Sequence, residues 1–482
     1  MNKTIRNASV FTLLLVLALL VRATWVQFYD SKALADDKQN RRNAIEQYAN
    51  PLGDIIVGGD AVTGSARTKG GDLKYKRTYK DGDLYSSVTG YSSQVYGATQ
   101  LEGIYKDVLD GTDTRLKNPL DTLTNKRADP GDVITTIDPA VQKAAYKSLG
   151  DKKGAAVAVD PKTGKILGLV STPSYDPSDI SGATDSKEWQ ALQKDEEKPM
   201  VNRALRQPLP PGSTFKLVVA AAALEDGLYG SADTGTDSPN PYTLPGTRTV
   251  LKNESASAPC EDASIRTALQ YSCNNVFAKL AVDLGQDKVK AMAEKMGFNT
   301  DKLDVPVRAS ESVYPSDMDK AQTALTGIGQ FDVTATPLQM SMVTGAIANG
   351  GELVSPHMVS QITDSNGDVL DSFDDADSER VMSEDTASQL QSAMETVVEK
   401  GTGTNARISG ADVGGKTGTA QHGENNSKTP YAWFTSYAKG GDGKEVAVAV
   451  IVESSDAARS EVSGNGLAAP IAKSMMSAAL KR

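Results

Sequence analysis

The longest apolar run of the chain lies at its N-terminus. Two basic residues, Lys3 and Arg6, precede an uncharged run at 8–21 that is rich in Leu and Val. Aromatic residues, which favour the membrane interface, follow this run: Trp25, Phe28 and Tyr29. A membrane-spanning helix needs about 20 residues. The segment 5–28 reaches that length when the charged ends of Arg6 and Arg22 extend to the two membrane surfaces.

We therefore expect residues 1–29 to form a cytoplasmic tip and a transmembrane signal-anchor. Basic residues before an anchor place the N-terminus inside, so the remainder of the chain lies outside the cytoplasm. A cleaved signal peptide is the main alternative, because Ala-Leu-Ala at 33–35 resembles a cleavage site. That site lies well beyond the apolar run, which favours an uncleaved anchor. A buried N-terminal helix of a cytoplasmic protein is the third interpretation.

The stretch 30–130 is polar, with Gly-rich turns and scattered tyrosines. The short runs 54–57 and 84–88 fit β-strands between turns. Nothing in this stretch has a catalytic pattern. We expect a small, strand-rich, non-catalytic module, or a stalk that holds the rest of the chain away from the membrane.

From residue 131 to 482 the pattern becomes that of a mixed domain. Apolar strands at 154–160 and 165–170 flank a turn, and two more strands follow near the C-terminus at 432–437 and 445–452. Helical spacing occurs between and beside them, at 140–149, 214–225, 263–271, 275–284, 338–348, 383–399 and from Leu467 onward. Strands at both ends with helices between them predict one sheet, built from both ends of the segment and packed by helices, which is an α+β fold.

Composition narrows the function classes. The 482 residues are enough for two or three domains. The net charge of −10, without a Lys/Arg-rich run, argues against a nucleic-acid partner. The chain has two cysteines and two histidines and no C-x-x-C or H-E-x-x-H pattern, so we expect no metal site and no cofactor.

Ser213 and Lys216 are the first candidates for chemistry. Prolines and a glycine precede them, and the following run FKLVVAAAAL is apolar all round, which predicts a buried helix. Ser213 would lie at the N-terminus of that helix and Lys216 one turn later on the same face. A serine hydroxyl needs a neighbouring base to be a nucleophile, and a lysine whose pKa is lowered by burial or by a second cation can be that base. A simple helix cap with a solvated lysine fits the same residues.

The S-x-x-K pattern occurs a second time, at Ser436 and Lys439. That copy falls in or at the end of a predicted strand, where residues three apart point to opposite faces. It therefore cannot form a Ser–Lys pair. A second motif, S-x-N, lies at Ser272 and Asn274, in a short break between two predicted helices, where a hydroxyl and an amide can face a cleft or simply cap a helix.

The segment GADVGGKTGTA at 410–420 fits two motifs. It matches G-x-x-x-x-G-K-[ST], the nucleotide phosphate loop, and it contains K-T-G, a signature of penicillin-binding proteins and class A β-lactamases. A phosphate loop leads directly into a helix, whereas helix-breaking residues follow Thr417. We therefore interpret the segment as a strand edge from which Lys416 faces a cleft. Gly418 would allow the substrate backbone to come close.

The three motifs, in the order S-x-x-K, S-x-N and K-T-G, resemble those of the penicillin-interacting serine transferases. The sequence is most similar to a class B penicillin-binding protein, the membrane-anchored peptidoglycan D,D-transpeptidase, of the short PbpA-like type. Further segments carry the resemblance: Asp160-Pro161, Thr163-Gly164, Gly327-Ile328-Gly329-Gln330, Gly401-Thr402-Gly403 and Ala432-Trp433-Phe434. It implies an antiparallel sheet with helices on both faces over 131–482, and a pedestal-like or dimerisation-like module over 30–130.

The resemblance also implies roles for individual residues. Ser213 attacks the D-Ala-D-Ala carbonyl of a stem peptide, and Lys216 takes its proton. Ser272, helped by Lys416, passes a proton to the leaving amine, and Asn274 holds Lys216 and the substrate amide. The substrate carboxylate, or that of a β-lactam antibiotic, binds the hydroxyls of Thr417 and Thr419, and the backbone N–H groups of Ser213 and Thr419 form the oxyanion hole. The implied partners are peptidoglycan stem peptides, β-lactams, the membrane, and a polymerase or scaffold of the division or elongation machinery.

Several alternatives remain open at this stage. A β-lactamase would need a water-activating Glu, and the segment at Glu294 does not match that pattern. A D,D-carboxypeptidase and a non-catalytic scaffold share parts of the sequence pattern. Cys260 and Cys273 fit either a disulfide that clamps the loop before Ser272 or two free buried thiols. His422 fits a loop residue better than a catalyst.

Overall fold

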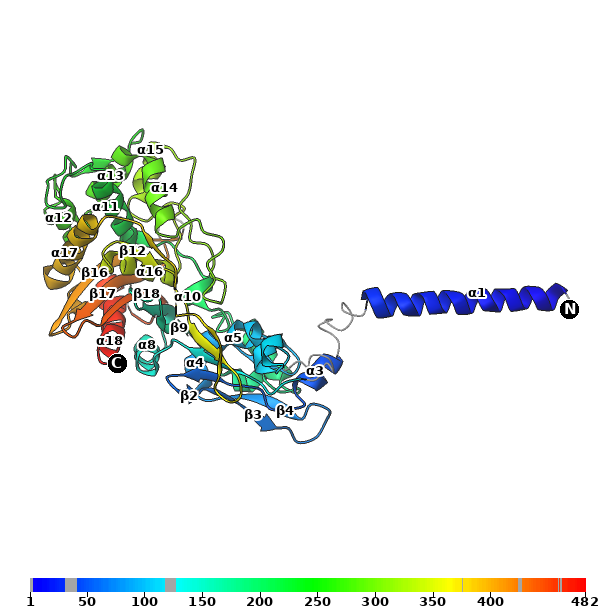
Figure 1. Cartoon of the computed structure of the whole chain (residues 1–482). Coiled ribbons are helices and arrows are strands. Elements are labelled where there is room, and N and C mark those ends of the chain that lie inside the picture. The colour runs from blue at the N-terminus through cyan, green and yellow to red at the C-terminus, as the bar shows by residue number, and fades with distance from the viewer. Residues whose placement is uncertain are drawn as a thin grey trace.

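The computed structural model describes residues 3–30, 41–117, 127–374, 376–423, 427–457, 459 and 462–482. Helix α1 (Lys3–Trp25), which continues into the short π-helix η1 (Val26–Asp30), stands apart from the body of the molecule (Figure 1). Within the segment Lys3–Tyr29, an 18-residue window has a mean hydropathy of 2.1, and none of α1 is buried. Its length and composition are those of a membrane-spanning helix, as the sequence predicts.

The body begins with a small module of short elements. In chain order they are α3 (Arg41–Gln47), β1 (Ile55–Val57), β2 (Asp60–Ala61), β3 (Thr63–Arg67), β4 (Tyr75–Tyr79), α4 (Gly82–Thr89), β5 (Ser92–Ser93), β6 (Gly97–Ala98), α5 (Gln100–Ile104), α6 (Lys106–Leu109) and η2 (Thr114–Leu116). A buried ion pair lies at its centre, where Arg77 Nε donates to Glu102 Oε1 at 2.6 Å. The predicted strand at 54–57 is confirmed as β1.

The predicted strand at 84–88 is wrong, because these residues belong to helix α4. The apolar positions Leu84, Tyr85 and Val88 fit a helical repeat as well as an alternating one, and five residues are too few to decide between the two. Tertiary contacts select the helix. The carbonyl of Leu84 accepts a hydrogen bond from Gln142 Nε2 at 2.9 Å, and Ser87 Oγ donates to the carbonyl of Leu169 at 2.6 Å.

A mixed sheet joins the module to the rest of the body. Its strand order is β14-β13-β7-β1-β2, where β7 is Asp132–Thr135, β13 is Val359–Thr363 and β14 is Val369–Ser372. β1 runs parallel to β7, and β7 runs antiparallel to β13. Strands from both sides of the predicted boundary at residue 130 therefore share one sheet.

The main sheet has the order β16-β17-β18-β8-β9, and every neighbouring pair is antiparallel. Its strands are β8 (Lys153–Val159), β9 (Ile166–Thr172), β16 (Ala411–Ala420), β17 (Tyr431–Gly440) and β18 (Glu445–Ser454). The C-terminal strand β18 pairs with the N-terminal strand β8, which confirms the predicted sheet of two distant segments. The segment 411–420 forms the edge strand β16 and not a phosphate loop.

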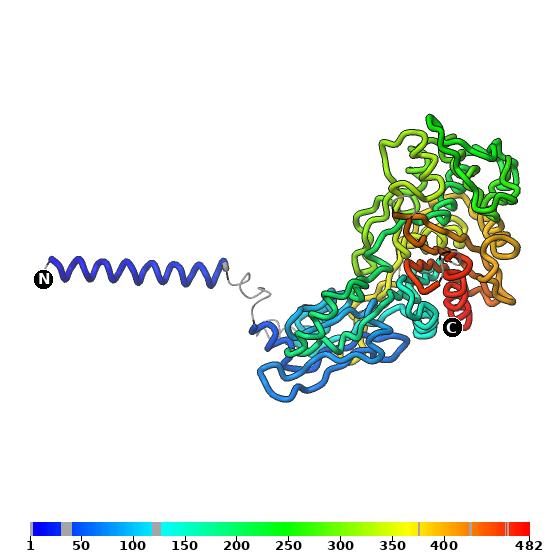
Figure 2. The backbone as a smooth tube through the Cα atoms, turned by 180° about the vertical axis from the view of Figure 1, so that it is seen from behind, coloured from blue at the N-terminus to red at the C-terminus, as the bar shows by residue number. Residues whose placement is uncertain are grey.

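Helices cover both faces of this sheet. Side chains alternate along β8, so Ala155 and Val157 join the core under α16 (Pro337–Ala348), whereas Ala156 and Ala158 join the core under α8 (Pro139–Leu149) and α18 (Ala469–Ala479). Burial on both faces explains why these strands are apolar throughout. In Figure 2 the red helix α18 lies beside the cyan segment that contains α8.

The remaining helices form a lobe at the end of the body farthest from α1 (Figure 1). They include η4 (Gly212–Phe215), α11 (Lys216–Glu225), α12 (Ile265–Tyr271), α13 (Asn274–Leu284), α14 (Gln286–Lys295), α15 (Lys320–Thr326) and α17 (Glu384–Lys400). The remaining short elements are η3 (Pro177–Ile180), α9 (Ser186–Lys194), α10 (Arg203–Arg206), β10 (Tyr242–Thr243), β11 (Val250–Leu251), β12 (Glu352–Val354), β15 (Ser378–Arg380), η5 (Thr404–Ala406) and η8 (Gly464–Ala468). The edge strand β16 and the lobe bring the three sequence motifs together.

Candidate active site

Ser213 lies in the 3-10 turn η4, directly before helix α11. The turn is held by Gly212, which has a φ of 54° and donates its N–H to the carbonyl of Gly329 at 3.0 Å. Eight of the ten α11 residues are buried, as the apolar sequence predicts. The core therefore fixes the turn, while Ser213 lines an open cleft.

Lys216 begins α11 and is fully buried. Its Nζ donates to the carbonyl of Ser272 at 2.8 Å, to Ser272 Oγ at 3.2 Å and to Asn274 Oδ1 at 2.8 Å. Two of these contacts come from the break between α12 and α13, and the third comes from the first residue of α13. The first and second sequence motifs therefore meet at this one amine.

Lys416 reaches the same hydroxyl from the edge strand β16. Its Nζ donates to Ser272 Oγ at 3.0 Å and to the carbonyl of Thr417 at 2.9 Å, and its side chain is fully buried. The hydroxyl of Ser272 thus lies between two lysine amines from different elements. All three motifs converge on this atom.

The two lysines have lowered pKa values. Burial lowers the pKa of Lys416 to about 8, and the nearby Glu254 carboxylate opposes part of this effect. Burial also lowers the pKa of Lys216 well below its usual value, and the positive charge of Lys416 adds to the shift. Because two adjacent ammonium groups repel each other in a buried site, Lys216 is the amine that gives up its proton more readily.

The loop that contains Asn253 and Cys260 is attached at two points to the S-x-N turn at 272–274. Cys260 and Cys273 form a disulfide with a Cα–Cα distance of 5.6 Å, which settles the alternative that the sequence left open. At the other end, Asn253 Oδ1 accepts the backbone N–H of Asn274 at 2.6 Å, and the carbonyl of Lys252 accepts Asn274 Nδ2 at 2.8 Å. The S-x-N turn is therefore held in place by one disulfide and two hydrogen bonds.

The remaining K-T-G residues line the strand edge. Thr417 Oγ1 hydrogen bonds to Thr402 Oγ1 at 2.8 Å. Thr419 lines the cleft together with Ser213 and Asn274. The sequence motif alone did not show that Thr402, on the turn after α17, supports Thr417.

The structure explains the glycine at position 418 by packing, and not by the expected approach of a substrate backbone. A Cβ at this position would lie 2.9 Å from the carbonyl oxygen of Pro211 and 3.1 Å from Thr214 Cγ2. The space beside Gly418 is thus occupied by the turn that carries Ser213, and not left for a substrate backbone. The absence of a side chain allows β16 to approach that turn closely.

A cleft of about 650 Å³ opens over these groups. Its lining includes Ser213, Asn274 and Thr419. It also includes three apolar side chains, Leu325, Ile328 and Phe331, and two charged ones, Lys252 and Glu254. Neither Asn253 nor Glu254 belongs to a motif, so no sequence pattern points to their place in the lining.

Other sequence candidates lie away from the cleft. In the second S-x-x-K copy, Ser436 contacts Met476 whereas Lys439 contacts Gln391, which confirms that the pair faces opposite ways. Glu294 is exposed and pairs with Lys290, and it does not line the cleft.

His422 lies in a loop, where its Nε2 is 2.7 Å from the carbonyl oxygen of Thr429 and its ring stacks on Tyr431. Within the described part of the chain, no group of three His, Cys, Asp or Glu residues is arranged to hold a metal ion.

The sheet between helices and the Ser–Lys–Ser–Lys arrangement define the class of penicillin-interacting serine enzymes. Residues 154–477 match the family described as penicillin binding protein transpeptidase domain, and residues 52–133 match the penicillin binding protein A dimerisation domain. The chain therefore belongs to the penicillin-binding protein transpeptidase family.

Its relatives include mycobacterial proteins that it matches over nearly their whole length. The peptidoglycan D,D-transpeptidase PbpA of Mycolicibacterium smegmatis is 35% identical over 497 residues, covering 100% of this chain and 99% of the relative. Penicillin-binding protein A of M. tuberculosis, solved as a ceftriaxone acyl-enzyme complex, has a TM-score of 0.83 at 34% identity, covering 90% of this chain and 100% of that structure. Pseudomonas aeruginosa PBP2 has a TM-score of 0.75 at 27% identity, with 89% and 96% covered.

Proposed function

We propose that the chain is a peptidoglycan D,D-transpeptidase in which Ser213 is the acylated nucleophile. The observation that carries this proposal is the convergence of Lys216 and Lys416 on Ser272 Oγ, at 3.2 and 3.0 Å, beside the turn of Ser213. Full-length similarity to PbpA proteins and to a β-lactam acyl-enzyme structure supports it.

Acylation begins when the neutral form of Lys216, which burial and the charge of Lys416 favour by lowering its pKa, removes the proton of Ser213. The serine oxygen attacks the carbonyl carbon of the penultimate D-Ala of a stem peptide, and the peptide C–N bond breaks. The nitrogen of the terminal D-Ala receives a proton through the hydroxyl of Ser272, and the terminal D-Ala then leaves. Ser272 can pass protons between Lys216 and Lys416, because its hydroxyl contacts both amines. Asn274 holds Lys216 through its Oδ1.

The developing oxyanion is stabilised by the backbone N–H groups of Ser213 and Thr419. Loss of one such donor typically costs about 3 kcal/mol of transition-state stabilisation. Thr417 and Thr419 hold the terminal carboxylate of the donor peptide, with the positive charge of Lys416 behind them. The amine of a second stem peptide then attacks the acyl-serine ester, forms the cross-link and returns the proton to Ser213. A β-lactam acylates the same serine and blocks this second step.

We further propose that α1 is an uncleaved signal-anchor with residues 30–482 outside the cytoplasm. Its 23 residues, apolar composition and lack of buried contacts support a single membrane span. On this arrangement residues 30–130 form a pedestal and residues 131–482 the transpeptidase domain. A partner from the division or elongation machinery would bring the growing wall to the anchored enzyme.

A donor–acceptor assay tests the proposed chemistry. The full-length protein is incubated with a stem peptide ending in D-Ala-D-Ala and with an acceptor amine. We expect released D-Ala and a cross-linked product, both lost in Ser213→Ala and both retained in Ser436→Ala, which removes the serine of the second S-x-x-K copy. Hydrolysed donor without cross-link would instead indicate a carboxypeptidase, and no reaction would indicate a scaffold.

A further inference from the structure

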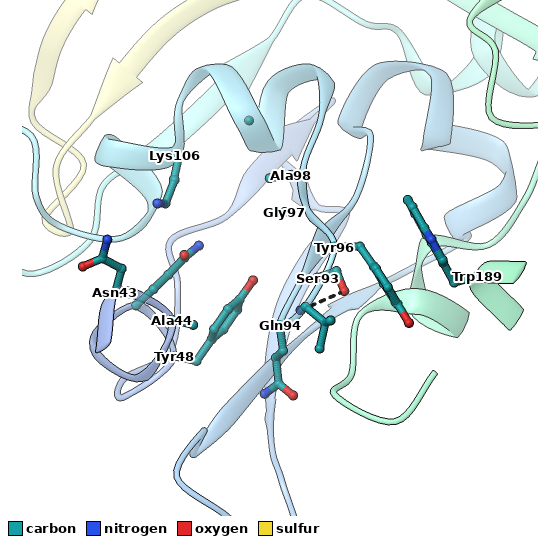
Figure 3. A pocket seen from close by; sticks show the side chains of 13 residues that line it. Asn43, Ala44, Tyr48, Ser93, Gln94, Tyr96, Gly97, Ala98, Lys106 and Trp189 are labelled. Carbon is teal, nitrogen blue, oxygen red and sulfur yellow. Dashed lines mark hydrogen bonds between the residues drawn. The ribbon is translucent and has the colours of Figure 1, made fainter. Parts of the chain in front are cut away.

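A second cavity, of about 560 Å³, lies in the N-terminal module (Figure 3). Its walls come from α3, from the hairpin of β5 and β6, from α5 and α6, and from Trp189 of helix α9. It shares no lining residue with the cleft of Ser213. Because Trp189 falls in the transpeptidase family match and the other walls in the module, the cavity forms only when both segments are folded together.

An aromatic wall borders this cavity. The ring of Tyr96 stacks on Trp189 with a centroid distance of 4.2 Å and an interplanar angle of 3°, and Tyr91 meets Trp189 edge-on at 5.7 Å. Both stacked rings are partly exposed and line the cavity (Figure 3). The stacking and the edge contact hold the wall rigid, so a ligand that packs on it costs little side-chain entropy.

The polar groups of the cavity favour hydroxyl and carbonyl partners. They are the amides of Asn43, Gln47 and Gln94, the hydroxyls of Tyr48 and Ser93, and the ammonium of Lys106. None of the described residues that line it is Asp or Glu, although acidic residues outnumber basic ones, 61 to 51, in the chain. The lining therefore offers no carboxylate to pair with a cationic ligand. Lys106 brings a positive charge to the lining, although part of its field acts on Asp110, whose carboxyl pKa is raised by burial and lowered in part by Lys106.

The cavity lies near the membrane end of the molecule. Helix α3, one of its walls, begins eleven residues after η1 ends, and the intervening segment 31–40 spans at most about 35 Å when fully extended. Figure 1 shows α3 and α5 at the end of the body near α1, whereas α12, α13 and β16 lie at the opposite end. A long polymer that contacts both sites would run along the body.

We propose that this cavity binds the glycan strand of peptidoglycan, through its N-acetylated aminosugar units. The inference rests on the proposed function, since the glycan strand is the polymer that carries the stem peptides. The apolar face of a pyranose ring packs on the aromatic wall of Tyr96 and Trp189 by dispersion and apolar burial. The amides exchange hydrogen bonds with hydroxyl and acetamido groups, and Lys106 binds a carboxylate or carbonyl oxygen.

Tryptophan fluorescence tests this proposal directly. The chain has three tryptophans: Trp25 lies in the anchor, Trp433 is fully buried, and Trp189 lines the cavity. The full-length protein in detergent is titrated with glycan strands from which an amidase has removed the stem peptides. We expect a saturable fluorescence change that is absent in Trp189→Phe. Binding measured by calorimetry should weaken about tenfold in a Tyr96→Ala, Lys106→Ala double variant.

Controls separate this site from the catalytic cleft. Tyr229→Ala removes a tyrosine that lies outside both cavities, and it should bind glycan like the wild type. Protein acylated by benzylpenicillin should also keep its glycan affinity, and the double variant should keep its acylation rate. The proposal is overturned if no saturable binding occurs, if acylation abolishes binding, or if the double variant binds normally. It is also overturned if the variants instead dissolve a dimer, because the cavity would then be an interface between two copies of the chain.

Discussion

Ser272 has a left-handed backbone conformation, with φ 58° and ψ 43°, that residues other than glycine rarely adopt. This conformation ends α12, turns the chain into α13 and aims both the carbonyl and the hydroxyl of Ser272 at Lys216. Such strain persists only when the surroundings enforce it. Here the disulfide of Cys273 and the hydrogen bonds of Asn274 supply that constraint.

The residue outside the motifs with the clearest expected effect is Glu254. Its carboxylate raises the pKa of Lys216 and of Lys416. Glu254→Gln should therefore lower both pKa values. Because acylation needs neutral Lys216, the rise of the acylation rate with pH should move to lower pH. The measurement is the rate of penicillin acylation from pH 5 to 9.

Glu261→Gln is the matched control, since Glu261 is an exposed carboxylate on the same loop and contributes to neither lysine shift. Its pH profile should overlay that of the wild type. A profile of Glu254→Gln displaced to higher pH, or not displaced at all, would contradict the electrostatic account.

Among the elements, the contact between β16 and η4 depends on Gly418. In Gly418→Ala, the new Cβ would lie 2.9 Å from the backbone carbonyl oxygen of Pro211, so strand and turn must separate. We expect the acylation rate to fall by about a hundredfold, since small displacements of reacting groups cost that much. Gly441→Ala is the control, because nothing lies within 4 Å of its Cβ position. Equal rates in both variants would show that the close approach is unimportant.

The disulfide between Cys260 and Cys273 is the second element-scale feature to test. The bond closes a loop with a sequence separation of 13, and a loop of that size contributes about 3 kcal/mol in the chain-entropy model. The Cys260→Ser, Cys273→Ser variant should melt at a lower temperature and acylate more slowly, because the S-x-N turn loses one of its clamps. Reductant should slow the wild type in the same way and leave the variant unchanged. A reductant-insensitive wild type would contradict this role.

Long elements were predictable from the sequence, and short ones were not. Sequence patterns several residues long predicted α11, β8 and β18. The break at Ser272 was predicted because helical spacing stops before it and resumes after it. Residues 84–88 fit two periods at once, and packing against β9 decided the outcome. Asn253 and Glu254 reach the site through a loop without a motif. Their contacts depend on distances between elements that the sequence pattern does not contain.

At the scale of the whole molecule, the apolar helix α1 and the elements that carry the three motifs lie at opposite ends. α1 has no buried residues, whereas the three motifs lie in the lobe and on the edge strand β16, at the far end of the body. Removing residues 1–29 should therefore move the protein from the membrane fraction to the soluble fraction. The acylation rate of the truncated protein should equal that of the full chain. A truncated protein that stays with membranes would show that another surface carries the attachment.

The mixed sheet holds the N-terminal module and the catalytic segment together. β1 and β7 pair with each other and β7 pairs with β13, so the module is held by backbone hydrogen bonds and not only by a linker. The cavity walled by α3 and Trp189 therefore keeps a fixed position relative to the lobe. A rigid body of this kind keeps the cavity and the catalytic cleft at a constant separation.

The most direct measurement is labelling of the full-length protein with a fluorescent penicillin, followed by peptide mapping of the adduct. The account predicts a stable adduct on the peptide that contains Ser213, and no adduct in Ser213→Ala. An adduct on Ser272 or elsewhere, a label that is released within minutes, or labelling that persists in Ser213→Ala would contradict the assignment of Ser213 as the nucleophile.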